Sequence, residues 1–292
     1  MTLNYFSKFK KFFRSKKEVV WINSYDKLQL LGNYLNGSEI IGLDTEFHWR
    51  NTYLPKISLI QLATRNRIFL IDCISLKNLE IVKKKLENRN NLIICHAVRS
   101  DSTVLFNSLN IKIKNIFDIQ IADKLINEGK IKSYGELVKN YLGIKLKKGE
   151  TNSNWLKRPL SSKQVEYACD DVDFLIDIYY KQTKILKKLG LMQEFFQASK
   201  KETSLGNELL HVSRLKKIKN SFKEEKMLFS WREKTASLKD VPPSYIFKDK
   251  DKKILLRMIS KLKTNKNFED ENLSKILKNE HLKSSFLEEF SL

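Results

Sequence analysis

The stretch that decides the fold is Ile40-Ile41-Gly42-Leu43-Asp44-Thr45-Glu46, in which an apolar strand runs into two acidic residues. Side chains alternate across a strand, so Asp44 and Glu46 point to the same side of it. Two carboxylates this close repel each other unless a cation lies between them. Hard cations such as Mg²⁺ and Mn²⁺ prefer oxygen ligands of this kind. The stretch therefore predicts a strand whose end binds a divalent metal.

The sequence around this stretch is typical of strands first, and of alternating strands and helices afterwards. Residues 57–62 and 67–72 have the pattern of two further strands around a turn at 64–66, and with 39–43 they predict an antiparallel meander. The remaining segments are predicted as strand 19–22, helix 24–35, helix 77–87, strand 91–95, helix 100–109, strand 116–117 and helix 118–127. A meander followed by alternating units predicts an α/β sandwich around a mixed sheet.

The clearest helix is predicted for residues 162–182. Ser161 and Gln164 have the spacing of a capping box, and apolar residues then recur on one face of the helix. Beyond about residue 190 the sequence is heavily charged and helical throughout. Strand signals cease there, which predicts a domain boundary near 200–215 and a smaller all-α C-terminal domain.

The composition indicates a folded, strongly basic protein. The 292 residues are 41% hydrophobic and carry a formal net charge of +21, from 55 Lys+Arg against 34 Asp+Glu. This excess fits a polyanionic partner, nucleic acid before an acidic membrane surface, although a compositionally biased genome gives the same excess. No apolar stretch approaches the roughly 20 residues that span a membrane. The three cysteines lie in apolar or helical contexts, and no pair of them has metal-ligand spacing. This indicates no disulfide framework and a reducing compartment, and we expect a cytoplasmic protein.

Residues 1–18 are predicted to form a basic N-terminal tail in which phenylalanines alternate with lysines. The tail lacks the uninterrupted apolar stretch of a secretory signal. Two interpretations remain open for it. One is a loosely ordered tail, and the other is a short amphipathic helix that touches RNA or anionic lipid.

Two more acidic sites lie further along the chain. Asp101 opens a helix that follows a predicted strand, and Tyr167 and Asp171 share one helix face at positions i and i+4. Taken singly, Asp101 fits a helix cap and the Tyr167/Asp171 pair fits an ordinary helix face. A carboxylate on the apolar side of a helix needs a partner, however. Together with the first acidic pair, the ordered set favours a shared metal site.

These ordered motifs resemble the DEDD superfamily of 3′→5′ exonucleases, in the branch with a tyrosine, and within that branch ribonuclease D. The likeness covers residues 19–185. The residues that carry it are 43–47, 53–55, 59–62, 96–101, 118–120, 155–160 and 166–172. The resemblance implies a ribonuclease H-like mixed sheet with helices on both faces, in an exonuclease domain at 19–205. Residues 215–292 faintly resemble the helical HRDC domain that follows the nuclease in ribonuclease D. The resemblance implies a domain that binds nucleic acid, and a helical cap that mainly covers the nuclease is the alternative.

The resemblance also implies a role for each motif residue. Asp44, Glu46 and Asp171 would hold one divalent ion, Mg²⁺ or Mn²⁺. Asp44 would bridge to a second ion that Asp101 helps to hold, and Tyr167 would position the attacking water or help to deprotonate it. Two metals supply a hydroxide near neutral pH and neutralise the leaving oxygen. A tyrosine with an ordinary pKa of about 10 is a poor free base, so orienting the water suits it better.

The resulting hypothesis is a 3′→5′ exoribonuclease that releases nucleoside 5′-monophosphates from single-stranded 3′ ends of structured RNA such as tRNA precursors. The first alternative is a DNA exonuclease with the same site, because the metals contact phosphate rather than sugar. The second is a non-catalytic nucleic-acid-binding protein on the same fold, although no metal ligand of the motifs is missing.

Several other residues are candidates for contacts with nucleic acid. Phe47, Trp49 and Tyr53 follow the first motif and are candidates for stacking on the 3′-terminal base, and for Phe47 core or loop packing is favoured over stacking. Arg158 and the lysines at 145–148 are candidates for phosphate contacts. His96 precedes the second motif aspartate, and we expect a structural role for it.

Overall fold

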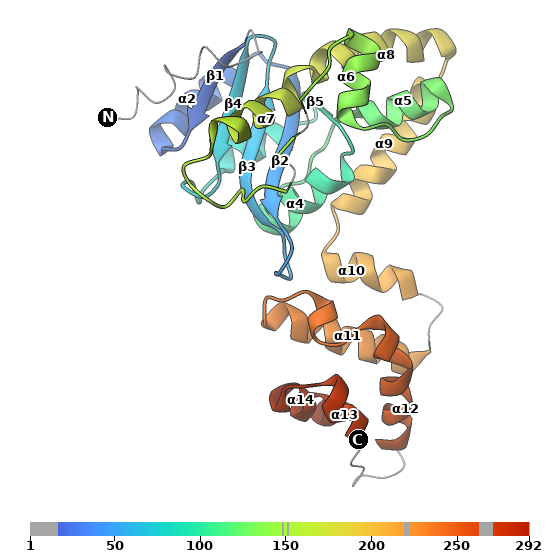
Figure 1. Ribbon diagram of the computed structural model, residues 1–292. Coiled ribbons are helices and arrows are strands. Elements are labelled where there is room, and N and C mark those ends of the chain that lie inside the picture. Colours follow the sequence, from blue (N-terminus) through green and yellow to red (C-terminus); the bar gives the residue numbers. More distant parts are fainter. Residues whose placement is uncertain (1–16, 148, 151, 219–221, 263–270, 292) are drawn as a thin grey trace. The chain divides into compact units, whose positions relative to one another are not determined.

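The computed structural model describes residues 17–147, 149–150, 152–218, 222–262 and 271–291 (Figure 1). Apart from its last two residues, the predicted N-terminal tail lies outside this part of the chain. The chain divides into two compact units. The first unit holds the residues up to His48 together with Lys56–Glu208, and the second holds Trp49–Pro55 and the chain from Leu209 onward.

The first unit is built on a six-stranded mixed sheet in the order β1-β4-β3-β2-β5-β6. The strands are β1 (Glu18–Ile22), β2 (Ile40–His48), β3 (Lys56–Ala63), β4 (Arg67–Asp72), β5 (Leu92–Cys95) and β6 (Ile116–Asp118). Strands β2, β3 and β4 form the predicted antiparallel meander, and β1, β5 and β6 pair in parallel with their neighbours. The central strand β2 lies between an antiparallel and a parallel neighbour, which confirms the mixed sheet.

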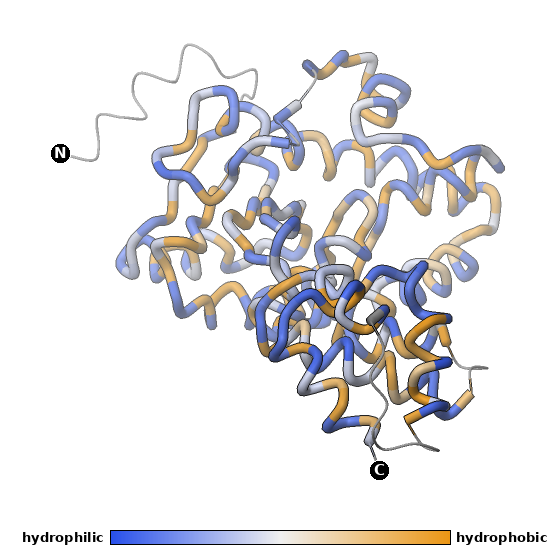
Figure 2. The backbone as a smooth tube through the Cα atoms, turned by 60° about the horizontal axis from the view of Figure 1, so that its bottom comes forward, coloured by the Kyte–Doolittle hydropathy of each residue, from blue (hydrophilic) through white to orange (hydrophobic). Residues whose placement is uncertain are grey.

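Helices cover both faces of this sheet, as predicted (Figure 1). One apolar core joins the sheet to α2 (Tyr25–Leu35), α3 (Glu80–Leu86) and α4 (Arg99–Leu109). The other core joins it to α5 (Ile119–Asn127), α6 (Tyr134–Leu142), α7 (Ser162–Asp173), α8 (Leu175–Leu189) and α9 (Met192–Gly206). Strands β3 to β6 are buried along nearly their whole length, because helices cover both of their faces. Figure 2 shows hydrophobic and hydrophilic residues mixed along the helical segments, as expected for helices that bury one side.

The strand that carries the acidic pair is longer than the sequence predicts. The prediction ends the strand at Leu43, whereas β2 continues to His48. Strand β3 pairs with β2 along this extension, with a register shift between Glu46 and Phe47. The acidic pair therefore lies inside a paired strand, and neighbouring strands hold its backbone. Bulges of this kind are common next to active sites, where they redirect a side chain.

The helix predicted for 162–182 is in fact two helices, because α7 ends at Asp173 and α8 begins at Leu175. The backbone N–H of Phe174, between them, donates to the hydroxyl of Tyr134, 3.3 Å away. A side chain thus takes the place of a helical carbonyl at the break. That side chain belongs to α6, which the sequence analysis missed although Ser133 and Glu136 form a capping box at its start.

The second unit is all α-helical, which confirms the prediction of a smaller helical C-terminal part. Its α-helices are α10 (Leu210–Leu215), α11 (Lys223–Leu238), α12 (Lys252–Leu262), α13 (Glu271–Ile276) and α14 (Glu280–Phe290). Helices α11 to α14 share one apolar core, in which the buried ring of Trp231 contacts the rings of Phe247, Phe286 and Phe290. Within the described part of the chain, every helix is too short or too polar to cross a membrane.

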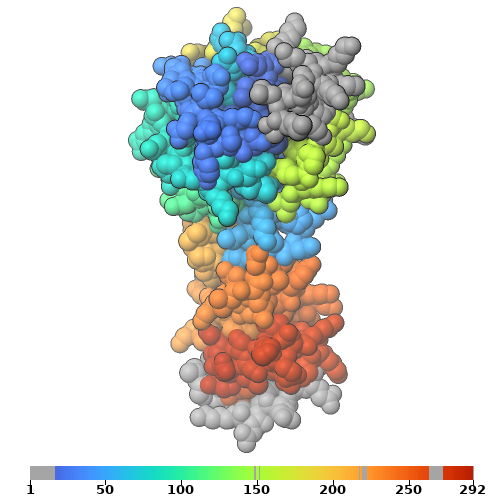
Figure 3. All heavy atoms as spheres, turned by 90° about the vertical axis from the view of Figure 1, so that its left-hand side faces the viewer, coloured from blue at the N-terminus to red at the C-terminus, as the bar shows by residue number. Residues whose placement is uncertain are grey.

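The connection between β2 and β3, Trp49–Pro55, belongs to the second unit. Its residue Tyr53 is 5% exposed, and its hydroxyl donates to the Glu233 carboxylate at 2.7 Å. Arg214 pairs with the same carboxylate at 2.8 Å, and the backbone N–H of Tyr53 donates to Asp240. In Figure 3 the blue atoms of this segment lie against the orange atoms of the helices. Tyr53 is therefore a core residue, and the suggestion that it stacks on a base is wrong.

Candidate metal centre

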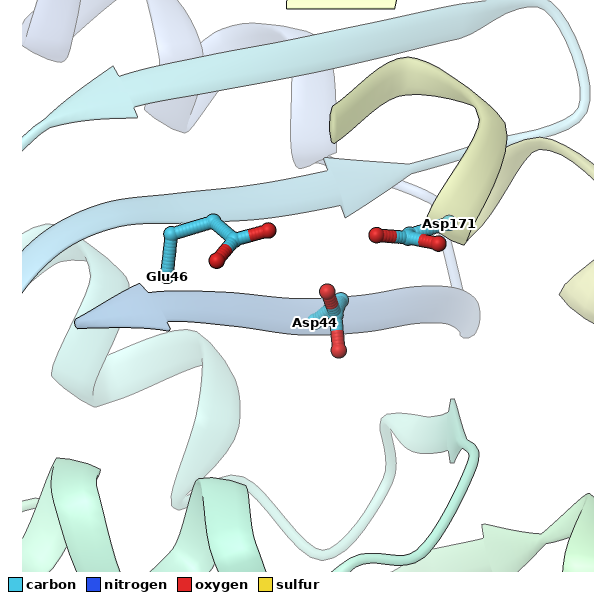
Figure 4. Close-up of side chains that lie close together, drawn as sticks. All are labelled: Asp44, Glu46 and Asp171. Atoms are coloured by element: carbon cyan, nitrogen blue, oxygen red, sulfur yellow. The ribbon is translucent and has the colours of Figure 1, made fainter. Parts of the chain in front are cut away.

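Three of the predicted site residues form one acidic cluster. Asp44 and Glu46 project from the same face of β2, and Asp171 projects from α7, so that their carboxylates converge (Figure 4). The three groups each offer an oxygen, and these oxygens lie within 4.8 Å of one another. All three residues are half-buried, which leaves the cluster reachable from solvent. Residues 127 positions apart in the sequence thus meet at one point.

Gly42 on β2 lets helices α7 and α8 approach the sheet closely enough for Asp171 to reach Asp44 and Glu46. A Cβ atom at Gly42 would lie 3.3 Å from the side chains of Ala63 and Leu175 and 3.4 Å from the Val172 carbonyl oxygen. Val172 directly follows Asp171 on α7. The close approach at Gly42 therefore sets how near the end of α7 lies to Asp44, two residues further along β2.

Arg158 fixes the segment that leads into α7. Its guanidinium donates to both oxygens of Asp72, at 3.0 and 2.7 Å, and also to the backbone carbonyls of Ser58 and Trp155. The side chain is 20% exposed and that of Asp72 is 4% exposed. The suggestion that Arg158 contacts phosphate is therefore wrong, because its donors are already used within the protein. It instead holds the α7 approach against strands β3 and β4.

Burial and neighbouring carboxylates disfavour the charged forms of all three acidic groups of the cluster. Burial, followed by the charges of Asp101, Asp171 and Glu46, raises the pKa of Asp44 well above its ordinary value. Burial and the charges of Asp171 and Asp101 raise the pKa of Glu46 to about 9. Burial also raises the pKa of Asp171 to about 8, against the lowering effect of a hydrogen bond from Tyr167. Three oxygen donors that resist ionisation together fit a divalent cation, which would favour their charged forms.

Asp101 is not one of the three residues whose carboxylate oxygens lie within 4.8 Å of one another. It is 3% exposed, and its carboxylate accepts a 2.6 Å hydrogen bond from the hydroxyl of Thr45, the residue between Asp44 and Glu46. Burial raises the pKa of Asp101 to about 7, although the bond from Thr45 lowers it. Its charge still acts on Asp44 and Glu46. The structure thus associates Asp101 with the cluster electrostatically rather than by direct contact.

The start of the helix that carries Asp101 is held by Asp118. The carboxylate of Asp118 accepts from the backbone N–H groups of Ala97 and Val98, at 3.1 and 2.8 Å. Ala97 has a φ angle of 59°, in the left-handed region that residues other than glycine rarely adopt. His96 lies beside this turn, with its Nε2 atom 3.0 Å from the Lys132 carbonyl oxygen, in the structural role we expected.

Tyr167 completes the predicted set and lies against the cluster. Its hydroxyl donates to Asp171, and its ring lies 6.0 Å from the ring of Trp155, between centroids. A Cβ atom at Gly149 would overlap the Tyr167 ring at 1.8 Å, so only glycine allows that backbone to lie there. Tyr167 and Asp171 line one cavity of about 270 Å³, which is large enough for part of a nucleotide beside the cluster.

Sequence reasoning missed Thr45 and Gln61 as parts of this site. Thr45 lies inside the first motif and faces the opposite side of β2 from the acidic pair, where it reaches Asp101. Gln61 pairs directly with Asp44 across strands β2 and β3. The contact of Thr45 with Asp101 and the pairing of Gln61 with Asp44 became visible only in the structure.

Comparison with known proteins agrees with this geometry. A family model described as 3′–5′ exonuclease matches residues 19–187. The chain belongs to this 3′–5′ exonuclease family. The matched residues include β2, β3, α4 and α7. All five predicted site residues therefore lie within the match: Asp44, Glu46, Asp101, Tyr167 and Asp171.

The relatives within this family include ribonuclease D proteins, as the sequence motifs predicted. The chain is 29% identical to ribonuclease D of Desulfotalea psychrophila over 78% of its length, and 33% identical to that of Xanthomonas oryzae over 70%. It spans 64% and 59% of those two proteins, less than two thirds of either. The crystal structure of Escherichia coli RNase D superposes with a TM-score of 0.80 at 22% identity, over 94% of this chain and 76% of that one. This likeness confirms the fold.

Proposed function

We propose that the protein is a metal-dependent 3′→5′ exoribonuclease that releases nucleoside 5′-monophosphates. The observation that carries this proposal is the convergence of Asp44, Glu46 and Asp171, with Tyr167 bonded to the last of them. Phosphodiester hydrolysis needs an activated water and a neutralised leaving oxygen, and paired divalent ions provide both when bound. The acidic cluster supplies the oxygen ligands that Mg²⁺ and Mn²⁺ prefer.

Each site residue has a role in this proposal. Asp44, Glu46 and Asp171 would hold one ion, and Asp44 together with Asp101 would hold a second. Asp101 keeps its place through Thr45, whose hydroxyl donates to it. The Tyr167 hydroxyl donates a hydrogen bond to Asp171, and its oxygen can accept a hydrogen bond from the attacking water and so orient it.

RNA is the proposed substrate, in particular single-stranded 3′ ends of structured RNA such as tRNA precursors. Likeness to ribonuclease D proteins and the net charge of +21 support this choice. DNA is the alternative substrate, since the bound metal ions would contact phosphate rather than sugar. Contacts to the 2′-hydroxyl decide between RNA and DNA. The three free cysteines suit a reducing compartment, and on that ground we propose a cytoplasmic location.

We further propose that the chain consists of an exonuclease domain at 19–205 and an HRDC-like domain at 215–292 that binds RNA. A groove of about 760 Å³ in the helical unit supports RNA binding. Its lining includes the exposed ring of Tyr245, one acidic residue, Asp251, and five lysines: Lys239, Lys248, Lys250, Lys275 and Lys278. Lysines attract a phosphate backbone, and an exposed aromatic ring provides a surface on which a base stacks.

The experiment that tests the proposal compares single-stranded RNA labelled at its 5′ end with the same RNA labelled at its 3′ end, in Mg²⁺ or Mn²⁺. We expect the 3′ label to leave at once as a mononucleotide, and the 5′ label to remain on a shortening ladder. EDTA and Asp44→Asn should each abolish both signals. Activity that survives either treatment would contradict the proposal. Parallel rates on DNA of the same sequence test the alternative substrate.

A further inference from the structure

Gln61 is a fully buried polar residue whose side-chain amide makes no hydrogen bond within the described part of the chain. It lies on β3 and is 0% exposed. Among the residues that the structure describes, neither its Nε2 nor its Oε1 atom has a hydrogen-bond partner. A buried polar group without a hydrogen-bond partner destabilises a fold, so such a group in a native core calls for an explanation.

The neighbours of Gln61 in the sheet indicate which partner is missing. Gln61 pairs with Leu70 on β4 and with Asp44 on β2. Leu70 has no polar side-chain atom, whereas Asp44 belongs to the acidic cluster. Directly opposed residues of antiparallel strands share a face, with Cβ atoms about 4.5–5.5 Å apart, a distance that a glutamine side chain spans. The one polar cross-strand neighbour of Gln61 is therefore a proposed metal ligand.

The Gln61 amide lies opposite Asp44 in the sheet and offers an N–H donor to it. A carboxylate that binds a metal keeps lone pairs that accept hydrogen bonds from such a donor. Carboxylates that bind metals are themselves hydrogen-bonded, and those partners orient them toward the ion.

We propose that Gln61 is a positioning residue, which donates a hydrogen bond from Nε2 to the Asp44 carboxylate when a divalent ion occupies the cluster. The inference rests on the proposed metal site. It assigns to β3 a part in the site that the acidic motifs do not reveal. The amide is retained in the core at a cost to the metal-free fold, and its benefit appears on metal binding.

The test replaces Gln61 by Met, which has a similar volume and no hydrogen-bonding amide, and in a second variant by Leu. Two quantities are measured on each folded protein: the urea midpoint in EDTA, and the Mn²⁺ dissociation constant by calorimetry. We expect the metal-free midpoint to stay equal or to rise, because an unsatisfied amide has been removed. We expect Mn²⁺ to bind at least about tenfold more weakly, the effect typical of losing a residue that orients a metal ligand.

Ser199→Ala is the matched control. The Ser199 hydroxyl is 1% exposed on α9 and also lacks a partner among the described residues. Its removal should raise the urea midpoint and leave Mn²⁺ affinity unchanged. Mn²⁺ affinity within twofold of wild type in either Gln61 variant would overturn the inference. So would a loss of metal-free stability that parallels the loss of affinity, because Gln61 would then act structurally. Failure of the wild-type protein to bind Mn²⁺ would instead contradict the proposed function.

Discussion

Neighbouring aspartates on α7 differ in what they do, and the difference can be measured. Asp171 belongs to the acidic cluster, whereas Asp170 lies outside it although both line the same cavity. We expect Asp171→Asn to lower kcat for RNA by about 10²- to 10³-fold, the scale seen when a group that stabilises developing charge is removed. Asp170→Asn is the matched control and should stay within a few-fold of wild type. Equal losses in both variants would contradict the assignment of Asp171.

The second prediction at this scale concerns Glu46 and pH. Its pKa of about 9 in the fold lies above the ordinary value of 4.5, so the folded protein holds a proton that the unfolded chain loses. The free energy of unfolding of the metal-free protein should therefore fall as pH rises from about 4 to 9. Glutamine does not titrate, so Glu46→Gln removes this fall in the free energy of unfolding. We expect the variant to be more stable than wild type by roughly 1–3 kcal/mol at pH 8 without metal.

Urea unfolding in EDTA at pH 5 and pH 8 measures this effect. The difference between the Glu46→Gln variant and wild type should be small at pH 5 and large at pH 8. Saturating Mg²⁺ should reverse the order, because only the wild type gains the full stabilisation of a bound ion. A variant that is less stable than wild type at pH 8 in EDTA would contradict the repulsion inferred for the cluster.

The site residues that the sequence revealed are those whose placement depends on local period. Strand alternation put Asp44 and Glu46 on one face, and helical spacing put Tyr167 and Asp171 on one face. Thr45 and Gln61 escaped prediction because their partners lie across the fold. The register of β2 against β3 and the docking of α4 decide those contacts, and neither can be deduced from residue spacing.

Among the elements, the ones predicted best are those whose ends are determined by their own residues. Strand β4 has the predicted bounds, and α2 begins after its cap Ser24 as expected. The break at Phe174 was missed because its cause is Tyr134, 40 residues earlier in the chain. The extension of β2 was missed because pairing with β3, rather than apolar content, keeps the strand extended to His48. Tertiary contacts thus override local pattern at the site itself.

The segment before α7 yields a prediction about an element as a whole. Arg158→Met would leave Asp72 buried without its positive partner, and breaking such a pair costs about 3–5 kcal/mol. We expect a loss of that size in urea unfolding. The double variant Arg158→Met with Asp72→Asn should recover part of the loss, since no unpaired charge remains. Arg158→Lys should lose nearly as much stability as Arg158→Met, because a lysine cannot donate to both oxygens of Asp72 as the guanidinium does. Full stability in Arg158→Met would show that the pair does not hold the segment.

At the scale of the whole molecule, the positive charge has two different consequences. A diffuse excess attracts any polyanion at long range, and salt screens that attraction within about 10 Å at 0.1 M. The groove of the helical unit concentrates lysines beside an exposed ring, an arrangement that a merely biased composition does not require. The two interpretations therefore make different predictions. In one, RNA binding depends on the lysines that line the groove, and in the other it depends only on the net charge of the protein.

Removing three lysines from the groove separates these interpretations. Each phosphate contact with a single strand contributes about 0.7 to the slope of log K against log salt. The triple variant of Lys239, Lys248 and Lys278 to Ala should lower that slope by about 2 in binding assays with catalytically inactive Asp44→Asn protein. The matched control changes three exposed lysines of the same unit that do not line the groove, Lys226, Lys234 and Lys253. Equal effects in the two triple variants would show that RNA responds to net charge alone, and the groove would lose its proposed role.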